Sequence, residues 1–157
     1  MTDLRTLAKI HCDPMSMRTE NGIPKDQAIL LGNSIVCDGY FKDNESPKTT
    51  AVISHFHDDH THNINKTLTN CDNILLTQPT YDALIGMKKI DERGTFKILS
   101  EGKSFHTNYN EKIELIDANH VPGSSQVLVT MPENDEKILY SGDFSYPGIT
   151  VPKANVL

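Results

Sequence analysis

A dense run of ligand-type side chains at the end of an apolar segment most constrains how this chain can fold. Residues 55–60 read HFHDDH and directly follow the apolar residues 51–53. Imidazole nitrogens and carboxylate oxygens are ligands for first-row metal ions, and three histidines with an aspartate can serve two ions. A strand that ends at Ser54 would stop pairing where these side chains begin, so the following loop can fold them around metal. The run therefore predicts a metal site.

The alternative interpretation is a histidine-rich surface loop without a function. Chance accounts poorly for the pattern, because four of the seven histidines lie within eight residues: His55, His57, His60 and His62. We therefore favour the metal site.

The composition fits a single domain and argues against a strongly basic nucleic-acid binder. The 157 residues suffice for one sizeable core. Lys and Arg number 15 against 21 Asp and Glu, but a nucleic-acid substrate is not excluded, since metal ions and local lysines can hold phosphate. Three dispersed cysteines without a C-x-x-C pair indicate reduced thiols. The sequence has neither a signal-peptide pattern nor an apolar run of roughly 20 residues, so we expect a soluble cytoplasmic protein without membrane contact.

Short apolar runs separated by turn residues predict a mixed α/β fold with many strands. A turn at residues 32–34 joins two of these runs into an expected hairpin, and the turn-rich residues 132–136 join two more. Pro79 and Thr80 open an expected helix over residues 81–89. Residues 1–26 are weakly patterned. Strands are expected over residues 28–31, 35–37, 50–53, 74–77, 95–99, 113–116, 126–131 and 137–141.

Two further strand ends carry ligand-type residues. His120 follows the expected strand 113–116, and Pro122 and Gly123 close a tight turn behind it. Asp143 follows the strand that ends near Tyr140. Alone, each residue is weak support for a site, because an aspartate after a glycine is usually a turn residue and a lone histidine is usually structural. Their order after the HFHDDH run gives them more weight.

The series of motifs resembles the metallo-β-lactamase fold superfamily. An H-x-H-x-D-H run, an NHVPGS turn at residues 119–124 and an SGDF strand end at residues 141–144 follow one another in the family's order. More narrowly, the chain is similar to the β-CASP nuclease branch, which includes RNA 3′-end-processing nucleases, Artemis-like repair nucleases and ligase-associated exonucleases. The resemblance covers residues 28–144. It implies a four-layer αββα sandwich, with residues 1–157 forming one metallo-β-lactamase-like domain that is C-terminally incomplete and holds the N-terminal half of the fold.

The resemblance also implies a set of metal ligands. Two ions would be held by six side chains: His55, His57 and His120 on the first, Asp59 and His60 on the second, and Asp143 bridging the two. Asp38 would orient a ligand histidine through its ring N–H. Asp58 stands at a variable position and is expected to be solvated, while His62, His106 and His11 match no ligand position.

The ligand set favours zinc, because histidine and carboxylate occur without thiolate, and leaves manganese and iron as alternatives. Two ions would lower the pKa of a shared water and neutralise charge on a scissile phosphate. The catalytic candidates are Asp59 and His120, and the resemblance implies that Asp59 accepts a proton from the water. The expected activity is phosphodiester hydrolysis in RNA or DNA.

Family members take one more ligand histidine and a covering helical domain from later residues. Both are missing here, so we expect an incomplete substrate groove.

Two other functions stay open. Thioesterases, lactonases and β-lactamases of the superfamily tend to carry a Gly after the histidine run and a Gly-His-Thr turn, whereas this chain has THN at residues 61–63 and NHV at residues 119–121. A non-catalytic scaffold or fragment would typically lose ligands, but every N-terminal ligand position is filled. Lys88, Lys89 and Arg93 can be a solvated face or a phosphate contact, and we favour the solvated face.

Overall fold

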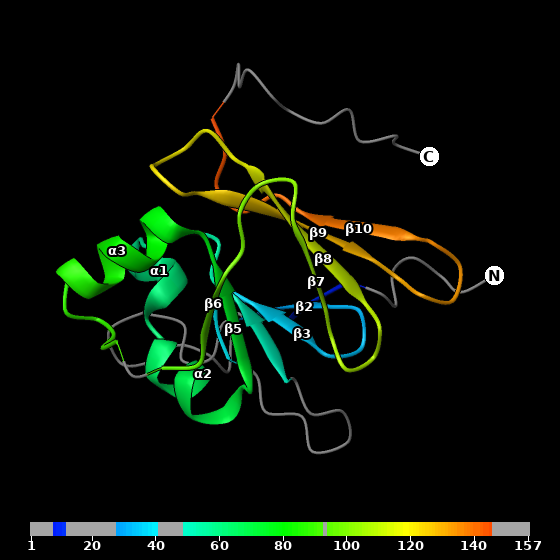
Figure 1. Ribbon diagram of the computed structural model, residues 1–157, viewed down its shortest axis with the longest axis horizontal. Coiled ribbons are helices and arrows are strands. Elements are labelled where there is room, and N and C mark those ends of the chain that lie inside the picture. The colour runs from blue at the N-terminus through cyan, green and yellow to red at the C-terminus, as the bar shows by residue number, and fades with distance from the viewer. Residues whose placement is uncertain (1–7, 12–27, 41–48, 93, 146–157) are drawn as a thin grey trace.

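Two stacked β-sheets form the body of the structure, a computed structural model that describes residues 8–11, 28–40, 49–92 and 94–145 (Figure 1). The first sheet has six strands in the order β1-β2-β3-β4-β5-β6. The first three pair antiparallel and the pairs from β3 to β6 are parallel. Its strands are β1 (Ala8–His11), β2 (Ala28–Leu31), β3 (Ile35–Cys37), β4 (Thr50–Val52), β5 (Asn73–Leu76) and β6 (Phe96–Ile98).

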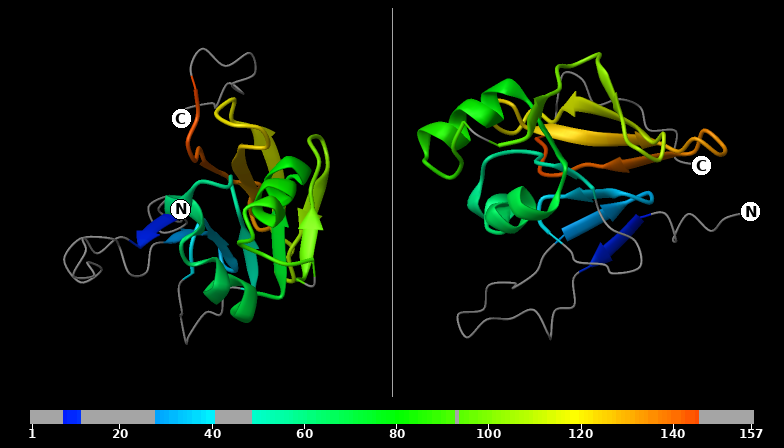
Figure 2. Two further views of the ribbon diagram at one scale, coloured as in Figure 1. Left: turned by 90° about the vertical axis from the view of Figure 1, so that its left-hand side faces the viewer. Right: turned by 60° about the horizontal axis from the view of Figure 1, so that its bottom comes forward.

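The second sheet has four antiparallel strands in the order β10-β9-β8-β7. They are β7 (Ser104–His106), β8 (Lys112–Asp117), β9 (Ser125–Thr130) and β10 (Lys137–Tyr140). Figure 2 shows the two sheets as separate layers, with the yellow and orange strands over the blue ones in its right-hand view. Three helices complete the described part: α1 (Asp58–Thr61), α2 (Ile64–Asn70) and α3 (Gln78–Gly86). None of the helices in the described ranges has the length and apolarity that crossing a membrane needs.

The strands β2 to β5 of the first sheet are buried on both faces. Leu31, Val52 and Leu75 face the second sheet, where they pack against residues such as Ile113 and Val127. The alternate residues of the same strands form a second apolar cluster with residues of the helices, among them Ile64 and Leu84. Burial on both faces explains why these strands read as nearly continuous apolar runs.

The segments that carry the candidate ligands begin directly after the parallel strands β3 and β4. The carboxyl ends of β3 and β4 lie at one edge of their sheet, so the residues after Cys37 and Val52 emerge side by side. Ser125 N donates to Ser54 O at 2.9 Å, which ties this edge to the start of β9 in the second sheet. Residues from both sheets therefore meet at one end of the sandwich.

The mixed α/β prediction is confirmed, and so are both expected hairpins, β2–β3 and β9–β10. The helix prediction was wrong in its bounds, because α3 begins at Gln78 and ends at Gly86 instead of spanning 81–89. Pro79 is tolerated inside the first turn, where its missing N–H has no intrahelical partner to lose.

Four elements were not predicted: β1, α1, α2 and β7. The sequences of α1 and α2 are mostly polar, and β7 contains one apolar residue, so none shows a clear period. The strand β1 falls within residues that were predicted to be weakly patterned, and it is specified by pairing with β2.

Candidate metal centre

Ser54 is the anchor of the ligand run. Its backbone N–H donates to Asp38 Oδ1 at 2.7 Å and its hydroxyl donates to Asp38 Oδ2 at 2.5 Å. The hydroxyl oxygen also lies 3.0 Å from His55 Nδ1, so it can accept the ring N–H of His55. Ser54 is 1% exposed and His55 is fully buried. The ring of His55 is thus oriented by Ser54, which Asp38 holds in place in turn.

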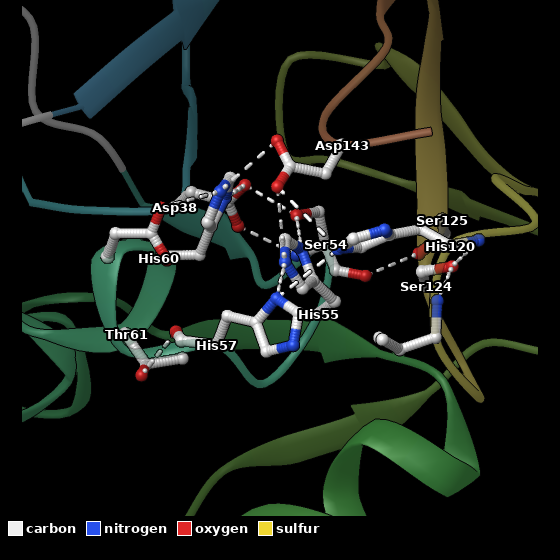
Figure 3. Close-up of polar contacts among 12 residues, drawn as sticks. Asp38, Ser54, His55, His57, His60, Thr61, His120, Ser124, Ser125 and Asp143 are labelled. Atoms are coloured by element: carbon white, nitrogen blue, oxygen red, sulfur yellow. Dashed lines mark hydrogen bonds and ion pairs between the residues drawn. The ribbon is translucent and has the colours of Figure 1, made fainter. Parts of the chain in front are cut away.

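Three histidine nitrogens converge on one point (Figure 3). His55 Nε2 lies 3.0 Å from His57 Nδ1, and His120 Nε2 lies 3.3 Å from the same Nδ1. One nitrogen carries at most one hydrogen, so it cannot donate to both neighbours. Nitrogens bound to one tetrahedral zinc ion at about 2.0 Å would lie about 3.3 Å apart. The arrangement therefore fits a shared cation.

Asp143 lies between two sets of rings. Its Oδ2 is 3.6 Å from His120 Nε2 and 3.9 Å from His55 Nε2, while its Oδ1 is 3.6 Å from His60 Nε2. The ligand atoms of His55, His57, His120 and Asp143 all lie within 4.8 Å of one another. Asp59 Oδ2 is 3.6 Å from the same Nε2 atom of His60. The structure thus brings together all six side chains singled out in the sequence.

Asp38 lies behind these side chains and is 5% exposed. One of its oxygens also lies within 4.8 Å of ring nitrogens of His55 and His60. We nevertheless exclude it as a ligand, because its carboxylate already accepts four donors: two from Ser54, the His60 ring at 2.7 Å and the Tyr140 hydroxyl at 2.8 Å. The bond to His60 Nδ1 leaves Nε2 free to face Asp59 and Asp143.

Comparisons with known proteins identify the fold. No protein-family model matches the chain. The chain is similar to the metallo-β-lactamase fold protein YhfI from Bacillus subtilis, with 12% identity, a TM-score of 0.58 and coverage of 88% of this chain and 62% of that one. The chain has the metallo-β-lactamase fold. The fold prediction is confirmed.

Two further structures agree with this metallo-β-lactamase fold. A B3 metallo-β-lactamase with an active-site glutamic acid matches at 11% identity and a TM-score of 0.53, covering 73% of this chain and 54% of that one. Rubredoxin oxygen:oxidoreductase from Desulfovibrio gigas matches at 13% identity and a TM-score of 0.51, covering 68% and 30%. These proteins differ in what their names say they do, so the likeness establishes the fold alone.

One curated relative matches part of the sequence. Over 46 residues, the chain is 50% identical to an Acidianus ambivalens protein described as an uncharacterized protein in the lig 3′ region. The match covers 29% of this chain and 32% of that protein. The chain therefore spans about a third of the curated relative and between 30% and 62% of these metallo-β-lactamase-fold structures.

The charge state of His55 suits metal binding, because a ligand histidine must be neutral. Burial and, to a smaller extent, the neighbouring His60 lower the pKa of His55 to about 4, so the ring is neutral at pH 7. Burial also lowers the pKa of His60, but its hydrogen bond to Asp38 and the nearby carboxylates outweigh burial and raise the pKa. Burial and the charge of Asp38 raise the pKa of Tyr140, which keeps its hydroxyl a donor.

Sequence reasoning placed Pro122 and Gly123 in the His120 turn but missed the role of Ser124 and the contact with α3. Ser124 Oγ accepts the backbone N–H groups of His120 and Val121 at 3.1 and 3.2 Å. Gly123 has φ +83°, and a Cβ there would lie 2.7 Å from Thr80 N at the start of α3. Residues 122–124 (PGS) indicate a turn, but no sequence pattern near them predicts that α3 packs against it.

The prediction that Lys89 is solvated was wrong. Its side chain is 20% exposed and forms an ion pair with Asp58, whose side chain is 89% exposed. The hydrogen bond from Lys89 lowers the pKa of Asp58. Lys88 is exposed, as expected, and so are His62 and His106, while Arg93 and the side chain of His11 lie outside the described residues.

Proposed function

We propose that this chain carries the metal centre of a metal-dependent hydrolase that cleaves phosphodiester bonds in RNA or DNA. The observation that carries the metal centre is the convergence of the nitrogens of His55, His57 and His120, with Asp143 placed between them and His60. The choice of nucleic acid as substrate rests on the NHVPGS and SGDF motifs, which resemble those of the β-CASP nuclease branch.

The donor set suits zinc. All of its atoms are imidazole nitrogens or carboxylate oxygens, and the thiols of Cys37 and Cys71 are buried. We propose two zinc ions, with manganese or iron as alternatives. When bound, the ions would lower the pKa of a shared water and neutralise charge on the scissile phosphate.

The chain's own residues have distinct tasks in this proposal. His55, His57 and His120 would hold the first ion, and Asp59 and His60 would hold the second. Asp143 presents one oxygen to each set.

Asp59 is the candidate proton acceptor, because its side chain is 74% exposed while His60 beside it is only 13% exposed. A carboxylate on the open side of the centre can reach a water that the buried rings cannot.

The substrate would approach from the side of His120. That ring borders a cavity of about 580 Å³, whose lining includes Gln78, Glu101 and Asn119. A cavity of this size can hold a nucleotide, whose base could hydrogen-bond to the amides of Gln78 and Asn119. The catalytic assignment of His120 rests on this position between the metal set and the cavity.

Hydrolysis assays on the purified chain test the proposal. With zinc or manganese added, we expect cleavage of single-stranded RNA or DNA that falls at least about 100-fold in His57→Ala. His106→Ala changes an exposed histidine on β7 and serves as the matched control. Hydrolysis of a thioester, a lactone or a β-lactam without cleavage of either nucleic acid would favour the alternative hydrolases. A chain that binds metal but hydrolyses none of these substrates would favour a non-catalytic role.

A further inference from the structure

Lys89 reaches the ligand run from the far end of α3. The chain leaves this helix through a turn in which Lys88 N donates to Ile85 O and Lys89 N donates to Leu84 O, both at 3.0 Å. This is the bonding pattern of a Schellman motif, whose left-handed position is usually glycine. Here Lys88 occupies that position with φ 57°. The turn places the next side chain, Lys89, against α1.

The Lys89 ammonium group is saturated by three acceptors. It donates to Thr61 Oγ1 at 2.6 Å and to the carbonyl oxygen of Phe56 at 3.4 Å, and it pairs with Asp58. An ammonium group has three hydrogens to donate. All three partners belong to residues 56–61, the segment that also contains His57, Asp59 and His60. One side chain therefore contacts both ends and the middle of the segment that carries these ligands.

Thr61 passes this restraint on to His57. Its hydroxyl accepts from Lys89 and donates to the His57 carbonyl oxygen at 2.9 Å. Thr61 is 3% exposed, so water competes little for these bonds. The helix α1 has only four residues and no side-chain hydrogen bond at its N-cap. So short a helix is unstable alone, and it depends on such outside contacts.

We propose that Lys89 is a positioning residue for the candidate metal centre. Its ammonium group fixes residues 56–61 so that His57 Nδ1 faces the ring nitrogens of His55 and His120 before an ion binds. The inference rests on the ligand assignment of the proposed function, but it concerns metal affinity and geometry rather than the substrate. An exposed ion pair would contribute little, whereas Lys89 is mostly buried and has two neutral acceptors besides Asp58.

Metal titration of the full chain tests this role. Lys89→Met keeps the length of the side chain and removes all three hydrogens, and Lys89→Arg restores the donors. Lys88→Met removes the neighbouring, exposed lysine and is the matched control. We expect Lys89→Met to weaken the tightest Co²⁺ and Zn²⁺ site about 10-fold or more and to shift the visible absorption bands of bound Co²⁺. Lys89→Arg should recover part of the affinity, and Lys88→Met should stay within about twofold of wild type.

Each outcome decides between this inference and the proposed function. Wild-type affinity and an unchanged Co²⁺ spectrum in Lys89→Met would overturn the role of Lys89. The proposed metal centre would still be supported if His57→Ala loses metal binding. If the wild-type chain binds no ion, both proposals fall. If Lys89→Met does not fold by circular dichroism, Thr61→Val decides, because it cuts the link to His57 and keeps the packing. Unchanged affinity in Thr61→Val would then overturn the inference.

Discussion

The two ends of strand β3 each hold a buried carboxylate, and the two carboxylates are used differently. Glu111, fully buried, accepts the Ser34 hydroxyl at 2.5 Å and the Thr107 hydroxyl at 2.9 Å, together with backbone N–H groups of the β2–β3 turn. Asp38, at the other end, accepts two donors from Ser54 and one each from His60 and Tyr140.

The difference lies in what the donors do with their remaining atoms. The donors of Glu111 are hydroxyl and backbone groups, none of which is a candidate metal ligand. The hydrogen bonds at this end therefore only join the two sheets. At the Asp38 end, the His60 ring keeps a second nitrogen that faces Asp59 and Asp143. In both places a buried carboxylate accepts four donors; it fixes a turn at one end of β3 and orients a candidate ligand at the other.

The largest effect is expected on stability, at the end of β3 that contacts Glu111. Glu111→Ala leaves several buried donors without an acceptor, so the free energy of unfolding should fall by about 3 kcal/mol. Chemical denaturation measures the change, and Glu114→Ala, partly exposed on the neighbouring strand β8, is the control. The metal affinity of the molecules that remain folded should change less than about twofold. A large loss of metal affinity in Glu111→Ala with unchanged stability would contradict the proposed difference between Glu111 and Asp38.

The next effect concerns the turn at the metal end. Gly123→Ala adds a Cβ at φ +83° that lies 2.7 Å from Thr80 N, so we expect stability to fall by about 2 kcal/mol and His120 to be displaced. Gly86→Ala, in α3, meets nothing within 4 Å and should be neutral or slightly stabilising. Thermal unfolding of both variants checks this pair, and equal losses in the two would contradict it.

Asp38→Asn sharpens the comparison further. An amide N–H₂ opposite His60 Nδ1 would move the ring proton to Nε2, the atom that faces Asp59 and Asp143. We expect the affinity for the second zinc ion to fall about 10-fold, with a smaller effect on the first. Calorimetric titration measures both affinities, and Asp72→Asn, an exposed residue before β5, is the control. Unchanged affinities would show that Asp38 is a structural tie like Glu111.

The smallest effect should come from Tyr140. Tyr140→Phe removes one of four donors to Asp38, so the free energy of unfolding should fall by about 1 kcal/mol while metal affinity changes less than about threefold. Tyr109→Phe, at an exposed tyrosine, should change neither quantity. A loss of metal affinity in Tyr140→Phe as large as that of Asp38→Asn would mean that the hydroxyl, rather than the carboxylate, orients His60.

Most of the strands and the candidate ligands could be predicted from the sequence. Most of the residues that hold these ligands in place could not. Apolar runs and turn residues located eight strands, and ligands at the ends of these strands meet because the strand ends share one end of the sandwich. The contact between Tyr140 and Asp38 joins residues 102 positions apart, and no local pattern encodes it. Lys89 was misread because its partners depend on where α3 ends, and the expected helix ended three residues too late.

Zinc stoichiometry by native mass spectrometry of the purified chain and its His57→Ala variant tests the central claim most directly. The account predicts two ions per wild-type chain and loss of the first ion in His57→Ala, because the nitrogen that this variant removes lies closest to those of both His55 and His120. His106→Ala should bind as the wild type does. A wild-type chain without bound metal, or a His57→Ala chain that binds as many ions as the wild type, would contradict the account.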